Sequence, residues 1–327
     1  AQHKVKNIPR WGERSEQKLA LRLGLLERST GRHLLSAVLP MADAIVAALS
    51  KAPSVKHCVY AGSLRRMQET VGDIDLIATG DKPERIRDVF INLPLVETVL
   101  ERGTTRSSVR LRNGIDADLR VVPDKVYGAT LQYFTGDKKH NIMLREYALS
   151  KGFTLSEYGL FKQRANGKGH ASTPVVCKTE EEIYTRLGLD TPPPELRQGT
   201  DEIDAAREHR LPDLLPYGSI KGDLQVQSNW TDGAVPIADM AAAAKRCGLS
   251  YMAVTDHTQA LAFIGGLKDA DVLRQGQEID ELNKKLSNFT ILKGTECDIL
   301  KDGELDLKDE TLARLNWVGV SVHSAFT

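Results

Sequence analysis

The chain is 327 residues long with 41% hydrophobic residues, which allows two or three globular domains. Its 44 Lys and Arg balance 44 Asp and Glu, but residues 1–164 hold 27 basic and 18 acidic side chains, a net of +9, which leaves the second half at −9. Taken alone, the zero net charge argues against a nucleic-acid partner, whereas the basic half could face phosphate. Two ordinary solvated surfaces would give the same charge totals. The four cysteines, at positions 58, 177, 247 and 297, form no CxxC pair, which indicates neither a disulfide framework nor a structural zinc site and favours a reducing cytoplasm.

Two helical segments are expected at the start. Residues 1–32 are basic, and leucines recur at helical spacing after Gly12, which predicts a short helical module. The most apolar run, Leu34 to Leu49, contains Pro40 and falls short of the roughly 20 residues that a membrane span needs. It predicts a buried helix, and no membrane partner is expected. The chain begins at Ala1 without Met, as expected of a processed or truncated terminus.

A mixed α+β unit follows. VKHCVYAGSLRR predicts a strand, a glycine turn and a helix, while GDIDLIATG and GIDADLRVVP predict strands with acidic residues at alternate positions. SSVRLRNG is expected to pair with the second of these strands as a hairpin. The clearest break in composition lies at 188–216 and includes TPPPELRQG, so a linker is placed at 191–216 with the domain boundary near residue 210. Beyond it, four strand-like runs alternate with segments such as IADMAAAAKRCG, which predicts parallel βαβ units.

Asp73 and Asp75 lie two apart in a predicted strand, so their side chains leave the same face. Asp118, in another predicted strand, would complete a site if the two strands are neighbours. Hard oxygen ligands without His or Cys favour two Mg²⁺ or Mn²⁺ ions over zinc and suit phosphoryl transfer. An isolated DxD is more often a solvated strand face, so the surrounding sequence has to decide.

That surrounding sequence contains GSLRR, ten residues upstream of the acidic pair. Gly62, Ser63 and Arg66 can present backbone N–H groups, a hydroxyl and a guanidinium to a triphosphate. Gly72 permits close approach of the backbone. A Gly-Ser turn followed by DxD is a much sharper signal than either alone.

The run AGSLRRMQETVGDIDLIATG resembles the nucleotidyltransferase signature of family X DNA polymerases, the group that includes polymerase beta. The resemblance continues through DADLRVVP and YFTGDKKHNIMLREYALSKGFTLSEYGLF. It implies an α+β nucleotidyltransferase fold with a polymerase-beta-like palm at 33–125 and a thumb at 126–190.

The resemblance also implies roles for individual residues. Asp73 and Asp75 would bind both metals, and Asp118 would bind the catalytic metal beside Arg120, near the primer end. The triphosphate contacts would be Gly62, Ser63, Arg66 and Gly72. The contacts to the incoming sugar and the minor groove would be Tyr133, Phe134, Gly136, Asn141 and Arg145. Lys138 departs from the pattern, because the family often has an acidic residue near the incoming base.

The opening VKNIPRWGERSEQKLALRL resembles the helix-hairpin-helix of the family's fingers, which places that module at 1–32. Arg10 and Gly12 would contact the DNA backbone without reading sequence. A plain basic helix pair is the competing interpretation. No counterpart of the family's lyase domain is recognised.

After the linker, DLQVQSNWTDG, AVTDH, LKGTECD and SVHS follow the motif order of the polymerase and histidinol phosphatase (PHP) domain, at 217–327. That resemblance implies a distorted parallel α/β barrel with Mn²⁺ or Zn²⁺ and 3′ to 5′ exonuclease activity. Gln225 and Gln227 replace the histidines of the first motif, and amides are much weaker ligands than imidazoles. The remaining ligand positions are Asp232, His257, Glu296 and His323. An incomplete barrel with a partial metal site is therefore expected, as a structural or binding remnant more than an active nuclease.

These features predict a monomeric, template-dependent polymerase that fills gaps in DNA base excision repair. Its partners would be gapped or primer-template DNA and deoxynucleoside triphosphates. One alternative is a template-independent nucleotidyltransferase, which need not keep Tyr133 to Arg145. The other is a non-catalytic DNA-binding scaffold, against which the intact aspartates count.

Overall fold

The computed structural model describes residues 31–164 and 170–323. The chain divides into two compact units, residues 1–212 and 213–327, each with its own hydrophobic core. All four cysteines are free thiols. Among the described residues, no helix combines the length and the apolar character needed to cross a bilayer.

The first unit opens with a sheet subdomain, defined here as residues 31–121. Its elements are β1 (His33–Leu34), α2 (Leu35–Ser50), β2 (Val55–Tyr60), α3 (Gly62–Arg65), β3 (Thr70–Val71), β4 (Asp73–Gly80), α4 (Pro83–Ile91), β5 (Val96–Arg102), β6 (Arg106–Leu111) and β7 (Asp116–Val121). Five strands form one sheet in the order β2-β4-β7-β6-β5, in which β4 and β7 are parallel and the other pairs antiparallel. The expected strands, the glycine turn and the hairpin of SSVRLRNG are confirmed.

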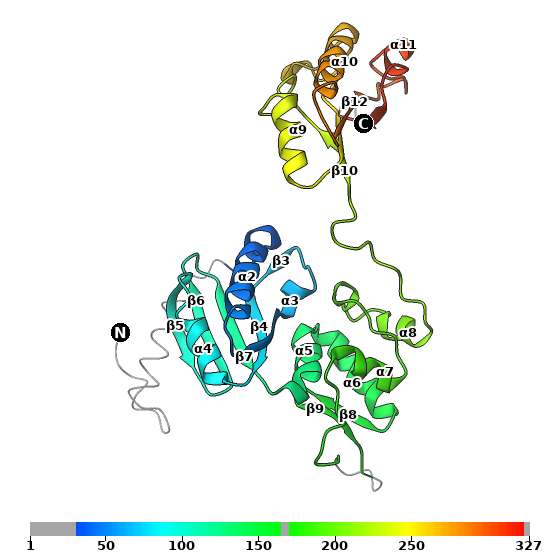
Figure 1. Ribbon diagram of the computed structural model, residues 1–327. Coiled ribbons are helices and arrows are strands. Elements are labelled where there is room, and N and C mark those ends of the chain that lie inside the picture. Colours follow the sequence, from blue (N-terminus) through cyan, green and yellow to red (C-terminus); the bar gives the residue numbers. More distant parts are fainter. Residues whose placement is uncertain (1–30, 165–169, 324–327) are drawn as a thin grey trace, which may run out of the picture. The chain divides into compact units, whose positions relative to one another are not determined.

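Helices α2 and α4 cover one face of this sheet (Figure 1). Val38, Ala42, Ile45 and Leu49 recur at helical spacing along α2 and are fully buried, which confirms the buried helix. On β7, Ala117, Leu119 and Val121 pack into the same core, and the alternating residues of that strand point the other way. The face opposite the helices therefore receives the polar side chains of β7.

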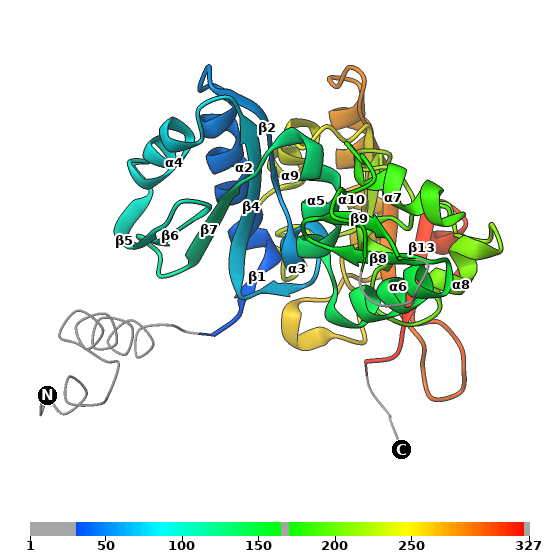
Figure 2. The same ribbon diagram turned by 90° about the horizontal axis from the view of Figure 1, so that it is seen from below.

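The second part of the first unit is a helical subdomain, defined here as residues 122–212. Its elements are η2 (Asp124–Val126), α5 (Tyr127–Thr135), α6 (Lys138–Ser150), β8 (Phe153–Ser156), β9 (Gly159–Lys162), α7 (Glu180–Leu187), η3 (Pro194–Leu196) and α8 (Glu202–Arg207). Helices α5, α6 and α7 gather around the β8–β9 hairpin (Figure 2).

Part of the segment expected as a linker, 191–216, is folded onto this helical subdomain. Ile203 and Ala206 on α8 are buried in the same core as Leu144 and Ile183. Helical spacing is hard to recognise in α8 because it is only six residues long and lies among prolines and charged residues. The division between the two compact units falls after Pro212.

The C-terminal unit contains β10 (Gly222–Val226), α9 (Ile237–Arg246), β11 (Tyr251–Val254), η4 (Ala262–Ile264), α10 (Asp269–Asn283), β12 (Thr290–Asp298), α11 (Asp309–Leu312) and β13 (Trp317–Ser321). The strands form a parallel sheet in chain order, which confirms the expected βαβ units. Within the described part of this unit the sheet is open. At its β13 edge, Trp317 and Val320 are exposed.

Candidate functional site

Three carboxylates meet on the face of the sheet subdomain opposite α2 and α4. The register of the parallel pair β4–β7 places Asp73 opposite Asp116 and Asp75 opposite Asp118. Residues two apart on a strand share a face, so Asp73, Asp75 and Asp118 point the same way. One oxygen from each lies within 4.8 Å of the others. The structure thus brings together the three aspartates that the sequence singled out, and we call them the carboxylate cluster.

Burial and mutual repulsion act on the two aspartates of β4. Burial is the largest cause for Asp75, the charges of Asp73 and Asp118 add to it, and the pKa of Asp75 rises to about 7. The pKa of Asp73 is also raised, by burial first and then by Asp118. The positive charges of Arg120 and Arg106 lower the pKa of Asp75 without cancelling the rise. A bound cation would offset the burial and the mutual repulsion that raise the pKa of Asp73 and Asp75.

The GSLRR turn lies against this cluster. Gly62 has φ +61°, and a Cβ added there would lie 2.7 Å from Asp75 Oδ2. The backbone N–H of Ala61 donates to the carbonyl oxygen of Asp75 at 2.8 Å. Ser63 follows in the first turn of α3. A Cβ added at Gly72 would meet nothing within 4 Å, so the space beside that residue is open.

Arg66 connects the turn to the helical subdomain. Its Nη1 donates to the carbonyl oxygen of Thr135, and a Cβ added at Gly136 would lie 3.1 Å from the same nitrogen. Burial is the largest cause that lowers the pKa of Arg66, although Asp137 opposes it. An anion bound beside this half-buried guanidinium would offset the cost of burying its charge.

The aromatic pair expected at the sugar lies where α5 approaches β7. Tyr133 and Phe134 contact each other edge to face, with ring centroids 5.1 Å apart. The guanidinium carbon of Arg120, on β7, lies 4.1 Å from the Phe134 ring centroid. On α6, Asn141 Nδ2 donates to the carbonyl oxygen of Tyr133 at 2.7 Å, and Arg145 Nε donates to the carbonyl oxygen of Asn141 at 3.1 Å. These residues therefore form a connected set beside Asp118's strand.

Two polar features escaped the sequence interpretation. Arg106, at the start of β6, donates to Asp118 and forms an ion pair with it. Arg65 forms a bidentate ion pair with Glu180, which also pairs with the fully buried Arg197. No local sequence pattern indicates either ion pair, because the partners are distant in the chain. In addition, the acidic run that contains Glu180, at the start of α7, looks like a solvated helix end. Arg10 and Gly12, expected to contact DNA, lie outside the described residues.

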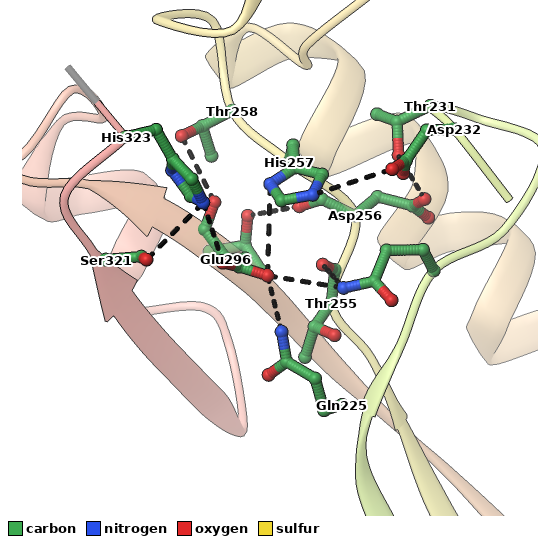
Figure 3. A network of polar contacts seen from close by, with 12 residues as sticks. Gln225, Thr231, Asp232, Thr255, Asp256, His257, Thr258, Glu296, Ser321 and His323 are labelled. Atoms are coloured by element: carbon green, nitrogen blue, oxygen red, sulfur yellow. Dashed lines mark hydrogen bonds and ion pairs between the residues drawn. The ribbon is translucent and has the colours of Figure 1, made fainter. Parts of the chain in front are cut away.

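A second polar cluster lies in the C-terminal unit (Figure 3). Ligand atoms of His257, Glu296 and His323 lie within 4.8 Å of one another. Asp232 does not belong to this set, although its Oδ2 lies 3.8 Å from His257 Nε2. His323 Nδ1 lies 2.9 Å from Asp298 Oδ1, and its Nε2 lies 3.2 Å from Glu296 Oε1. Asp298 thus orients the His323 ring towards Glu296, an arrangement common among metal-binding histidines.

Two glutamines, Gln225 in β10 and Gln227 directly after it, reach the same carboxylate. The amide nitrogens of Gln225 and Gln227 both donate to Glu296 Oε2, the latter at 3.2 Å. With His323 facing the other oxygen, nitrogen groups occupy both oxygens of Glu296. His257 Nδ1 is buried without a hydrogen-bond partner. These residues form a poor site for a single cation and a still poorer site for a cluster of metals. The reason is that the glutamine N–H groups, which cannot bind a cation, point towards the Glu296 carboxylate that would bind it.

Comparisons with known proteins agree with the geometry. The DNA polymerase beta thumb family matches residues 130–198, within the helical subdomain. The chain is 38% identical to the "DNA polymerase/3'-5' exonuclease PolX" of Bacillus subtilis over 99% of its length, and it spans 56% of that protein. It is also 27% identical over 156 residues to DNA polymerase lambda of Rattus norvegicus, covering 40% of this chain and 27% of that protein. The "Repair DNA polymerase X" of African swine fever virus is 26% identical over 142 residues, 41% of this chain and 77% of the viral protein. The thumb match and the similarity to the Bacillus protein along nearly the whole chain thus agree that this chain is similar to family X DNA polymerases over the part that it spans.

Proposed function

We propose that this chain is a template-directed DNA polymerase that adds deoxynucleotides to a primer 3′ end and fills gaps in DNA base excision repair. The observation that supports this most strongly is the carboxylate cluster, in which Asp73, Asp75 and Asp118 converge beside the glycine turn. The similarity to PolX, polymerase lambda and the viral repair polymerase supports the same reaction class.

The carboxylate cluster suits Mg²⁺ or Mn²⁺. Its ligands are all carboxylate oxygens, and a bound cation would offset the burial, and then the charges of Asp73 and Asp118, that raise the pKa of Asp75. Asp73 and Asp75 would hold two ions, and Asp118 would hold the one nearer the primer. When bound, the metals supply activation of the 3′ hydroxyl and stabilisation of the leaving pyrophosphate.

The protein's own contribution is to position the substrates. The turn at Gly62 and Ser63, together with Arg66, would hold the triphosphate beside the carboxylate cluster. Tyr133, Phe134 and Gly136 would face the sugar, while Gly72 leaves room for the nucleotide. Asn141, Arg145 and Arg120 would contact the nucleotide and the primer-template duplex.

The subdomains take corresponding roles in this proposal. Residues 33–125 act as the palm, 126–190 as the thumb and 1–32 as DNA-gripping fingers. Helix α8, within the segment 191–216, packs onto the thumb, and the chain continues after Pro212 to a PHP-type domain at 217–327. The glutamines on Glu296 favour a nuclease-impaired PHP domain with no complete Mn²⁺ or Zn²⁺ cluster.

Single-nucleotide incorporation into a duplex with a one-nucleotide gap tests the proposal, with Mg²⁺ and then Mn²⁺. Wild-type protein should extend the primer with the template-matched deoxynucleotide far faster than with mismatches or the ribonucleotide. Asp75→Asn should abolish extension while gapped-DNA binding persists. Asp116→Asn is the matched control, because Asp116 shares β7 and pairs with Arg110 outside the carboxylate cluster.

The other outcomes separate the alternatives. Addition of any nucleotide regardless of template would favour a template-independent nucleotidyltransferase. Binding of gapped DNA without extension in either metal would favour a scaffold. Full activity in Asp75→Asn would refute the assignment of the carboxylate cluster.

A further inference from the structure

Arg106 lies where a cation would bind at the edge of the carboxylate cluster. In the antiparallel β6–β7 pair, Ser108 is opposite Asp118 and Arg106 is opposite Arg120. The long side chain of Arg106 therefore reaches diagonally to Asp118, where Nη2 donates to Oδ2. The Asp118 side chain is only 13% exposed and that of Arg106 is 40% exposed, so Asp118 is the more buried partner of this ion pair.

The Arg106 guanidinium is hydrogen-bonded through one nitrogen and leaves another without a partner. Its Nη2 is committed to Asp118, whereas its Nε is buried without a hydrogen-bond partner. The positive charge acts on Asp73 and Asp75 as well as on Asp118. One arginine therefore balances part of the negative charge of the whole carboxylate cluster, through a contact that a stronger cation can replace.

We infer that Arg106 is a positioning residue that serves as the resident counter-cation of the carboxylate cluster. It stabilises Asp118 in the metal-free protein, and it must release Asp118 before a divalent ion takes that oxygen. Its presence weakens metal binding in the absence of DNA, which limits unproductive occupation of the site. The inference rests on the proposed function, because it takes Asp118 to be a metal ligand.

Arg110 provides a matched control on the same strand. Its Nε and Nη2 donate to Asp116, a carboxylate two residues before Asp118 on the same face of β7. The two arginines therefore share charge, strand and type of partner. They differ in that the partner of Arg106 belongs to the carboxylate cluster and the partner of Arg110 does not.

The test is a titration of the full chain with Mn²⁺ in the absence of DNA and nucleotide. Binding is measured by the electron paramagnetic resonance signal of the Mn²⁺ that remains free. Wild type is compared with Arg106→Gln, Arg106→Lys and Arg110→Gln, and Asp75→Asn identifies which sites belong to the carboxylate cluster. Arg106→Gln should bind about tenfold more tightly, a change of roughly 1.4 kcal/mol. Arg106→Lys and Arg110→Gln should stay within about twofold of wild type. Far-ultraviolet circular dichroism checks that each variant is folded.

Equal Mn²⁺ affinity of wild type and Arg106→Gln would overturn the inference about Arg106, but it would not contradict the proposal that the carboxylate cluster binds metal. An equal gain in Arg110→Gln would also overturn it, because the effect would then be one of overall charge. If no variant shows a site that depends on Asp75, the metal assignment itself fails, and the inference fails with it.

Discussion

Glu180 is the residue whose removal should most disturb the junction between the sheet and helical subdomains. It is the first residue of α7, and its side chain is 8% exposed. Arg65, from α3, donates to both of its oxygens at 3.0 and 2.9 Å, and Arg197 donates to Oε1. Arg197 is fully buried, and its guanidinium also donates to the carbonyl oxygen of Pro192 and lies over the ring of Tyr184. One carboxylate therefore neutralises two guanidinium groups from two subdomains.

Glu180→Ala would leave Arg197 buried without its counter-charge. Removing one partner of a buried ion pair costs about 3–5 kcal/mol. We expect the lower end, about 3 kcal/mol, because Arg65 is 22% exposed and can turn to water. For a unit of this size each kcal/mol lowers the melting temperature by roughly 2–4 °C, so a fall of roughly 6–12 °C follows.

Differential scanning calorimetry of the full chain measures the shift, and hydrogen exchange locates it. Amides of α5, α6 and α7 should lose protection, while those of β11 and β12 in the C-terminal unit should not. Glu181→Ala is the matched control, since this neighbouring glutamate is exposed. A melting-temperature shift for Glu180→Ala no larger than that for Glu181→Ala would refute the reasoning.

Three further predictions concern the glycine turn, the Glu180 ion pairs and the two glutamines of the C-terminal unit. Gly62→Ala should abolish nucleotide incorporation, because the added Cβ would collide with Asp75. Gly152→Ala is the control: Gly152 also has a positive φ, but a Cβ there would meet nothing within 4 Å, so this variant should lose only roughly 1–2 kcal/mol of stability and retain activity. Equal incorporation by the two variants would contradict this prediction. The pKa of Glu180 is lowered from 4.5 to about 2, so its stabilisation is present above about pH 4.5 and is lost as the pH falls through about 2. The melting temperature of wild type should therefore fall more steeply across that range than that of Glu180→Gln, and parallel curves would count against the ion pair. Gln225→His combined with Gln227→His should tighten Mn²⁺ or Zn²⁺ binding by the C-terminal cluster in calorimetric titrations, because imidazole replaces amide donors; an isotherm like that of wild type would exclude this explanation.

Local sequence patterns were sufficient for much of the architecture. The helical period of α2 and the two-residue period of β4 and β7 each depend only on side chains close together in the chain. For the same reason, Asp73 and Asp75 had to share a face once β4 was a strand. The parallel strands of the C-terminal unit followed equally from alternating strand and helix signals.

Contacts between distant segments were decided only by tertiary structure. The β4–β7 pairing brings Asp118 beside Asp75 although 42 positions separate them in the chain, and no periodic pattern encodes which strands become neighbours. The same holds for Arg106 beside Asp118. Glu180 looks solvated in sequence, and it becomes a buried anion because Arg65 and Arg197 converge on it. The local order of residues fixes which side chains are available and on which face of a strand they lie. The charge around each carboxylate depends on distances in space, so it was set by the packing of distant segments.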